Sequence, residues 1–189
     1  MIRAASRRSK LALAVAALGF LAASPARAEE RISRAGVSRN GRFAVRLVEE
    51  AKDRCRVEVL KEGSTAHWHL PRCVGTVDDL FFVSDDGERF WVLKTFPEKP
   101  TTRDKRGRDQ GWTSAVVAVL YDRRGNVVRE VRLNEVVRTQ AGLDNVRQFK
   151  KRFQWLGGVS GVPGNPPRLN AAGRVEFDTV EPRTHQFAF

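Results

Sequence analysis

The residues with the clearest capacity for chemistry are cations gathered in one polar stretch, 98–111. This stretch has no apolar residue except Pro100. A polar loop of this length is uncommon in a compact domain and is often either functional or disordered. Clustered positive charge favours contact with lipid head groups, acidic polysaccharide or nucleic acid. No nucleic-acid-binding motif accompanies this stretch, so nucleic acid is the poorest of the three. We therefore predict a loop that binds an anionic partner, with a solvated excursion as the alternative. Its binding residues are Lys99, Arg103, Lys105, Arg106 and Arg108.

A second group of cations follows about forty residues later. Asn134 is expected to cap one short helix and Asp144 another, within an insert near 134–152. In the second helix, Val146, Phe149 and Phe153 would share the apolar face. The polar side would form a second basic surface beside the first, or only the solvent face of an amphipathic helix. It would carry Arg147, Lys150, Lys151 and Arg152.

Three further patterns resemble catalytic or metal sites but fall short of them. His67 and His69 would share one face of a strand, yet zinc needs a third ligand, so we predict no metal. The run 158–162, Gly-Val-Ser-Gly-Val, lacks the last glycine of a nucleophile elbow, and no parallel α/β pattern surrounds it. The turn carboxylates have no calcium-loop spacing. The sequence therefore predicts no cofactor and no catalytic residue.

Cys55 and Cys73 are the only two cysteines. An even pair in an exported chain is typical of a disulfide. Residues 54–60 and 65–70 show alternation and are separated by a turn at 61–64, so folding about Gly63 brings the cysteines opposite each other. We predict a disulfide that closes the open end of a hairpin, with a reactive redox pair as the alternative.

The elements that must position these groups are mostly strands. The stretch 79–96 contains two apolar runs joined by the turn Ser-Asp-Asp-Gly, and its large side chains place the core there. A Gly/Pro-rich loop follows later at 157–167. We predict a mainly β, antiparallel fold, either blade-like sheets or a sandwich. Its strands lie near 42–48, 54–60, 65–70, 79–83, 89–96, 113–121, 126–133, 174–179 and 184–189.

The turn before one of these strands recurs. Ser38-Arg39-Asn40-Gly41 and Ser84-Asp85-Asp86-Gly87 have Ser and Gly at the same offsets, and 170–173 is a weaker third copy. Between residues 38 and 133 this repeat resembles the blade repeat of WD-type and TolB-type β-propellers. The first copy has Asn40 where the family pattern has Asp. The resemblance implies two or three propeller-like repeats, fewer than a closed propeller needs, so the sheets either stay open or complete a ring by oligomerising.

The N-terminus has the pattern of a secretory signal peptide. A basic segment precedes the apolar run 11–23, and Ala26-Arg27-Ala28 is a cleavage site. Cleavage would leave residues 29–189 as one antiparallel β domain. The leader holds five basic residues and no acidic one, so the formal charge would fall from +12 to +7 (12 − 5). We expect a periplasmic or secreted location and no membrane span after cleavage.

These patterns favour a non-catalytic exported domain that binds a protein or an anionic envelope component. The predicted export and the lack of a nucleic-acid motif disfavour nucleic acid as a partner. One alternative is an exported enzyme of unidentified class. The other is an outer-membrane barrel, because the chain ends in an alternating aromatic strand, 184–189. Against the barrel, the remaining strands lack aromatic girdles.

Overall fold

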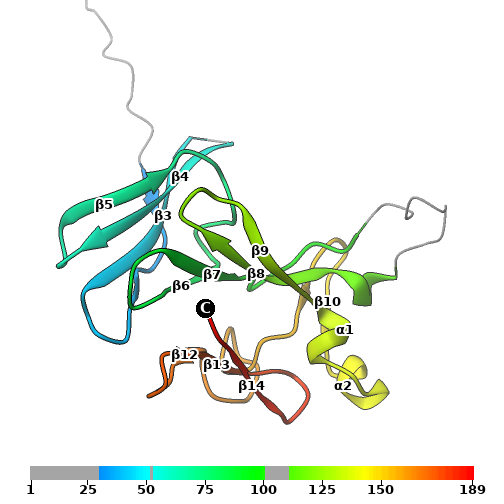
Figure 1. Ribbon diagram of the computed structural model, residues 1–189. Helices are drawn as coiled ribbons and strands as arrows, with labels where there is room; N and C mark the ends of the chain where they lie inside the picture. Colours follow the sequence, from blue (N-terminus) through cyan, green and yellow to red (C-terminus); the bar gives the residue numbers. More distant parts are fainter. Residues whose placement is uncertain (1–29, 52, 101–110) are drawn as a thin grey trace, which may run out of the picture.

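The computed structural model describes residues 30–51, 53–100 and 111–189. The protein is mainly β, and three antiparallel sheets of three or more strands follow one another along the described chain (Figure 1). In the first sheet, β1 and β2 both pair with β3, and β4 and β5 follow. The bounds are β1 Arg31–Ile32, β2 Gly36–Val37, β3 Phe43–Ala51, β4 Arg54–Lys61 and β5 Thr65–Leu70.

The second and third sheets are also simple meanders. The second has the order β6-β7-β8-β9 and the third β12-β13-β14. The second sheet contains β6 Leu80–Val83, β7 Arg89–Leu93, β8 Val116–Asp122 and β9 Val127–Arg132. The third contains β12 Arg168–Leu169, β13 Val175–Asp178 and β14 Thr184–Phe187. The predicted antiparallel β fold is therefore confirmed, and β5 has the predicted bounds.

The second sheet lies between the two apolar cores of the protein. Phe90 and Val92 of β7 point into the core shared with the first sheet, and Trp91 and Leu93 point into the core shared with the third. All four side chains are fully buried. A strand covered on both faces needs a continuous apolar run rather than an alternating one. The sequence placed the core at this stretch, and that placement is correct.

The recurring turn has the same geometry in its two stronger copies. The Gly41 and Gly87 amides each donate to the carbonyl of the serine three residues earlier, at 3.0 Å. Both glycines have positive φ, +73° and +75°, which a residue with a side chain adopts only with strain. The weaker third copy, 170–173, makes the same backbone hydrogen bond, and so does the turn 122–125 between β8 and β9.

Asn40 explains why the first copy departs from the repeat. Its Oδ1 accepts from the Ser38 hydroxyl at 2.8 Å, as Asp86 Oδ1 does from Ser84 at 2.5 Å. Its side-chain amide also donates to the Asp85 carbonyl at 2.9 Å, which a carboxylate could not do. Asparagine at this position therefore joins the first turn to the second.

The segment between the second and third sheets corrects two predictions. The cap predicted at Asn134 is wrong, because the first helix begins one residue earlier and Arg132 occupies the cap position. Two short helices lie there, α1 Leu133–Val136 and α2 Gln140–Asp144, but Thr139 caps α2 and Asp144 ends it. The helix predicted to start at Asp144 is wrong, because the following residues form a hairpin of β10 Arg147–Gln148 and β11 Phe153–Gln154. Val146 and Phe153 reach the core from this hairpin, whereas Phe149 stays exposed.

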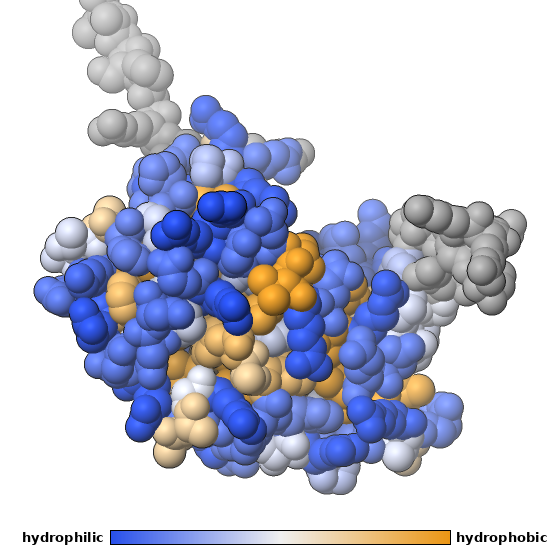
Figure 2. Space-filling view, viewed as in Figure 1, coloured by the Kyte–Doolittle hydropathy of each residue, from blue (hydrophilic) through white to orange (hydrophobic). Residues whose placement is uncertain are grey.

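The remaining differences concern very short elements. The sequence predicts no strand before residue 42, but β1 and β2 lie there. Likewise β12 was not predicted. A 3-10 turn, Trp112–Ser114, precedes β8. The segment 157–167 contains turns and no strand or helix, as expected for a Gly/Pro-rich loop. Figure 2 shows a largely hydrophilic surface with apolar residues gathered near β9, where Val127 and Val128 are half exposed.

Candidate anion-binding surface

The β10–β11 hairpin joins two basic segments that are far apart in the sequence. It packs alongside residues 97–99, which follow β7 in the chain. The Lys99 amide donates to the Lys151 carbonyl at 2.8 Å, and the Phe153 amide donates to the Pro97 carbonyl at 3.2 Å. Glu98 and Arg152 form an antiparallel bridge between these two hydrogen bonds. The start of the predicted basic loop and the second basic group are therefore neighbours.

The result is one predominantly positive surface, which we call the basic hairpin surface. Arg152 is paired with Glu98 at 3.5 Å, and Lys99 Nζ donates to Gln148 Oε1 at 3.1 Å. Lys150 and Lys151 are exposed at the hairpin turn and form no ion pair within the described part of the chain. The surface has more cations than carboxylates, so it favours anions. It consists of Phe96, Glu98, Lys99, Phe149, Lys150, Lys151 and Arg152, whereas Arg147 donates to the Gly161 carbonyl at 3.5 Å.

An apolar shelf lies within this surface. Phe149 and Phe96 meet edge to face with ring centroids 6.2 Å apart. The two rings line an open cavity of about 440 Å³, and the other lining residues are Lys150, Lys151 and Arg152. The surface thus offers apolar carbon and positive charge to the same partner.

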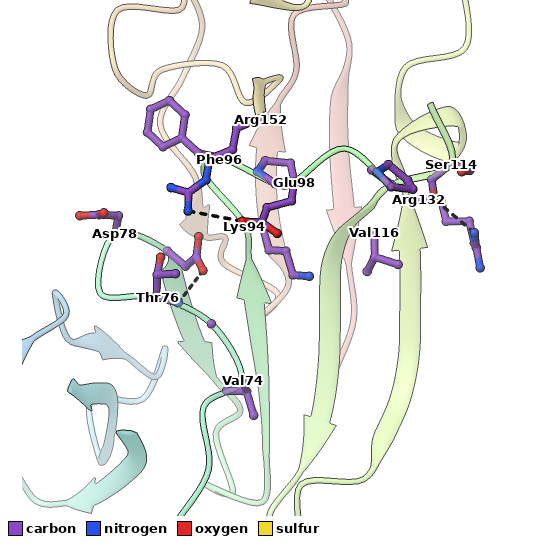
Figure 3. A pocket seen from close by; sticks show the side chains of 15 residues that line it. Val74, Thr76, Asp78, Lys94, Phe96, Glu98, Ser114, Val116, Arg132 and Arg152 are labelled. Atoms are coloured by element: carbon purple, nitrogen blue, oxygen red, sulfur yellow. Dashed lines mark hydrogen bonds and ion pairs between the residues drawn. The ribbon is translucent and has the colours of Figure 1, made fainter. Parts of the chain in front are cut away.

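A second and larger cavity, of about 540 Å³, adjoins the shelf and shares Phe96 and Arg152 with it. Figure 3 shows that its cations come from three segments. Lys94 follows β7, Arg132 ends β9, and Arg152 belongs to the hairpin. Arg132 Nη1 donates to the Ser114 carbonyl at 3.1 Å, which fixes its position. The carboxylates lining the cavity are Asp78, Asp79 and Glu98, so its charge is mixed.

Asp79 has a structural task in this cavity. Its Oδ1 accepts from the Thr95 amide at 3.0 Å, and its Oδ2 accepts from the Thr76 amide at 2.8 Å. Burial raises the pKa of this carboxyl, and the two backbone donors oppose that rise. Because both oxygens are occupied by backbone, Asp79 ties the loop before β6 to the end of β7.

Only part of the predicted binding set can be placed. Lys99 lies at the basic hairpin surface, as just described. Arg103, Lys105, Arg106 and Arg108 lie outside the described residues, so their role stays a prediction. The sequence pattern indicates the hairpin cations, although as part of a helix, and it does not indicate Lys94 or Arg132. Single cations at strand ends have no sequence signal that separates them from ordinary surface residues.

The predicted disulfide is confirmed. Cys55 and Cys73 are bonded, with their Cα atoms 4.9 Å apart. Val57 pairs with Leu70 in the β4–β5 register, so the bond lies just beyond the last paired residues and closes the open end of that hairpin.

The other candidate groups do not assemble into a site. His67 lies 5.1 Å from the Phe43 ring, and its Nε2 is 3.7 Å from Glu88 Oε1. Within the described ranges, no three His, Cys, Asp or Glu residues are grouped closely enough to hold a metal. Ser160 has a positive φ of +49°, but the three histidines lie on β5 and β14, and none of them is hydrogen-bonded to it in the described chain.

Comparison of the chain with protein-family models, with curated protein sequences and with solved structures found no match.

Proposed function

We propose that this chain is an exported, non-catalytic β domain that binds an anionic component of the cell envelope through the basic hairpin surface. The observation that carries the proposal is the docking of the hairpin beside Lys99. It brings together cations that are about fifty positions apart in the sequence. If the hairpin had only a structural role, its exposed turn would not need two lysines, Lys150 and Lys151.

The disulfide supports the compartment in this proposal. Disulfides persist in oxidising compartments, so the Cys55–Cys73 bond is compatible with an extracellular or periplasmic location. Among the described residues, no helix has the length and apolar character needed to cross a membrane. The predicted signal peptide, residues 1–28, lies outside the described part of the chain and remains a prediction.

Binding to anionic polymers and vesicles tests the proposal. Residues 29–189 would be titrated with an acidic polysaccharide and with anionic lipid vesicles at low and moderate salt. We expect binding that weakens as salt rises, because exposed charges are screened within about 10 Å at 0.1 M salt. Two variants identify the residues: Lys150→Ser with Lys151→Ser, and a loop variant in which Arg103, Lys105, Arg106 and Arg108 become Ser.

A matched control removes the same amount of charge elsewhere. Arg124 and Arg174 are exposed in turns at the opposite end of the sheets from the hairpin. Changing both to Ser should leave binding nearly unchanged, whereas the Lys150/Lys151 variant should bind more weakly. Equal losses in the two variants would mean that only net charge matters. Absence of binding to every anion would contradict the proposal and direct the search to protein partners.

A further inference from the structure

Phe149 occupies an unusual place for a large apolar side chain. The Phe149 amide donates to the Arg152 carbonyl at 2.8 Å, which closes the hairpin turn with Lys150 and Lys151 at its tip. Its residue surface is 49% exposed, and it is the only aromatic residue among the exposed large hydrophobic residues of the described chain. The neighbouring Phe153 is fully buried. The turn therefore presents one phenyl ring to solvent between positive charges.

We propose that this turn docks on an anionic lipid bilayer, with Phe149 inserted at the boundary between head groups and acyl chains. Lys150, Lys151 and Lys99 would then face the lipid phosphates. This inference rests on the proposed function and specifies its anionic component as a membrane surface. An aromatic residue flanked by Lys and Arg is the combination that binds shallowly to such surfaces.

Two features favour lipid over a soluble polyanion. Phe has no polar atom, so its exposed ring gains more from apolar carbon than from a hydrated polymer chain. The shelf beside it, about 440 Å³ and walled by Phe96 and Phe149, is open toward the same side as the turn lysines. Lysine side chains can also keep their charge at the head groups while their methylenes cover apolar surface.

Vesicle binding with two separate variants tests the proposal. Co-sedimentation would compare vesicles of phosphatidylcholine alone with vesicles that contain about one third phosphatidylglycerol. We expect binding only to the anionic vesicles. Lys150→Ser with Lys151→Ser should weaken it about 25-fold, because each cation near an anionic surface is worth about a factor of five. Phe149→Ser should weaken it about fivefold through lost apolar burial.

The controls separate insertion from general stickiness. Val128→Ser removes a similarly exposed apolar side chain at the start of β9 and should have no effect. Binding of the Phe149→Ser variant to dextran sulfate, a soluble polyanion, should equal that of the unchanged chain. If Phe149→Ser binds anionic vesicles as well as the unchanged chain does, the lipid inference is overturned.

A depth measurement completes the test. In a Phe149→Trp variant, acyl-chain-brominated phosphatidylglycerol vesicles should quench the added fluorescence, and the unchanged chain provides the background of its four native tryptophans. Binding without added quenching would overturn insertion and leave anion binding intact. Binding to dextran sulfate but not to vesicles would do the same. Binding to neither would contradict the proposed function itself.

Discussion

At the scale of single residues, the Asp79 carboxylate lines the larger cavity and joins two backbone segments there. Each of its oxygens accepts one backbone amide, from Thr76 and Thr95. Asp79→Asn keeps the size but turns one acceptor into a donor, so one buried amide loses its partner. We expect the free energy of unfolding to fall by about 1–3 kcal/mol, measured by urea denaturation. Asp78→Asn, in the exposed neighbour, should change it by less than about 0.5 kcal/mol.

We expect His185 to make the free energy of unfolding depend on pH. Its ring stacks on Phe177 at 5.5 Å, its Nε2 is buried without a partner among the described residues, and burial lowers its pKa. Arg183 and Arg138 lower the pKa further, whereas the Val136 backbone and Glu181 oppose them. The unfolded chain therefore takes up the proton first as pH falls. His185 contributes its full stability above its unfolded pKa of about 6.5 and loses that contribution as pH falls toward the folded pKa.

The test compares the unchanged chain with His185→Phe between about pH 7.5 and pH 5. The phenyl ring keeps the stacking on Phe177 and removes the titration. We expect the free energy of unfolding to decrease with falling pH by less in the variant than in the unchanged chain. Equal slopes in the two proteins would show that His185 does not titrate on unfolding in this range.

At the scale of elements, the disulfide stabilises the β4–β5 hairpin at the edge of the first sheet. The bond joins residues 18 positions apart. Restriction of the unfolded chain by a loop of this size is worth about 3 kcal/mol in the entropic account. Replacing both cysteines by Ser should lower the free energy of unfolding by about that amount. Two cysteines that react freely with an alkylating reagent, without reductant, would instead show that the bond does not form.

Also at this scale, the elements differ in how well local pattern predicts them. The alternation of apolar and polar residues, together with the turn residues between them, predicts the positions of the longer strands closely. Strands of two residues, such as β1, β2 and β12, are too short to show any period. The spacing of Val146, Phe149 and Phe153 fits a helix, yet a tight hairpin buries Val146 and Phe153 equally well. Only the docking of this hairpin onto 97–99 decides between them, and that contact is not encoded locally.

The same limit applies to the site. The sequence shows two groups of cations but not their adjacency, because backbone hydrogen bonds between distant segments create it. The role of Asn40 is likewise not predictable from local sequence. It departs from the turn repeat because it serves the neighbouring turn as well. The likeness to propeller blades stays a prediction.

At the scale of the whole molecule, both ends of the stack of sheets are covered by polar networks. On the first sheet, Glu58 is paired with Arg46 and Arg56, at 2.8 and 2.7 Å. On the third sheet, Glu176 is paired with Arg168 at 2.6 Å and accepts from Gln186 at 2.9 Å. A polar outer face gives another copy of the chain no apolar surface on which to pack. We infer that the stack ends here rather than continuing into a second copy.

This inference predicts a monomer. Light scattering of residues 29–189 should give the mass of one chain at all concentrations in the micromolar range. Changing Arg46, Arg56 and Glu58 together to Leu would make the outer face of the first sheet apolar and should cause concentration-dependent association. A stable dimer or ring of the unchanged chain would contradict the inference.

We propose above that anions bind at the surface formed by the hairpin and residues 96–99. The most direct measurement is the change in backbone amide NMR signals when low-mass dextran sulfate is added at low salt. We expect the largest changes within 96–99 and 147–153. The turns 84–87 and 170–173, at the opposite end of the sheets, should hardly change. Changes centred on those turns, or spread evenly over the exposed arginines, would contradict it.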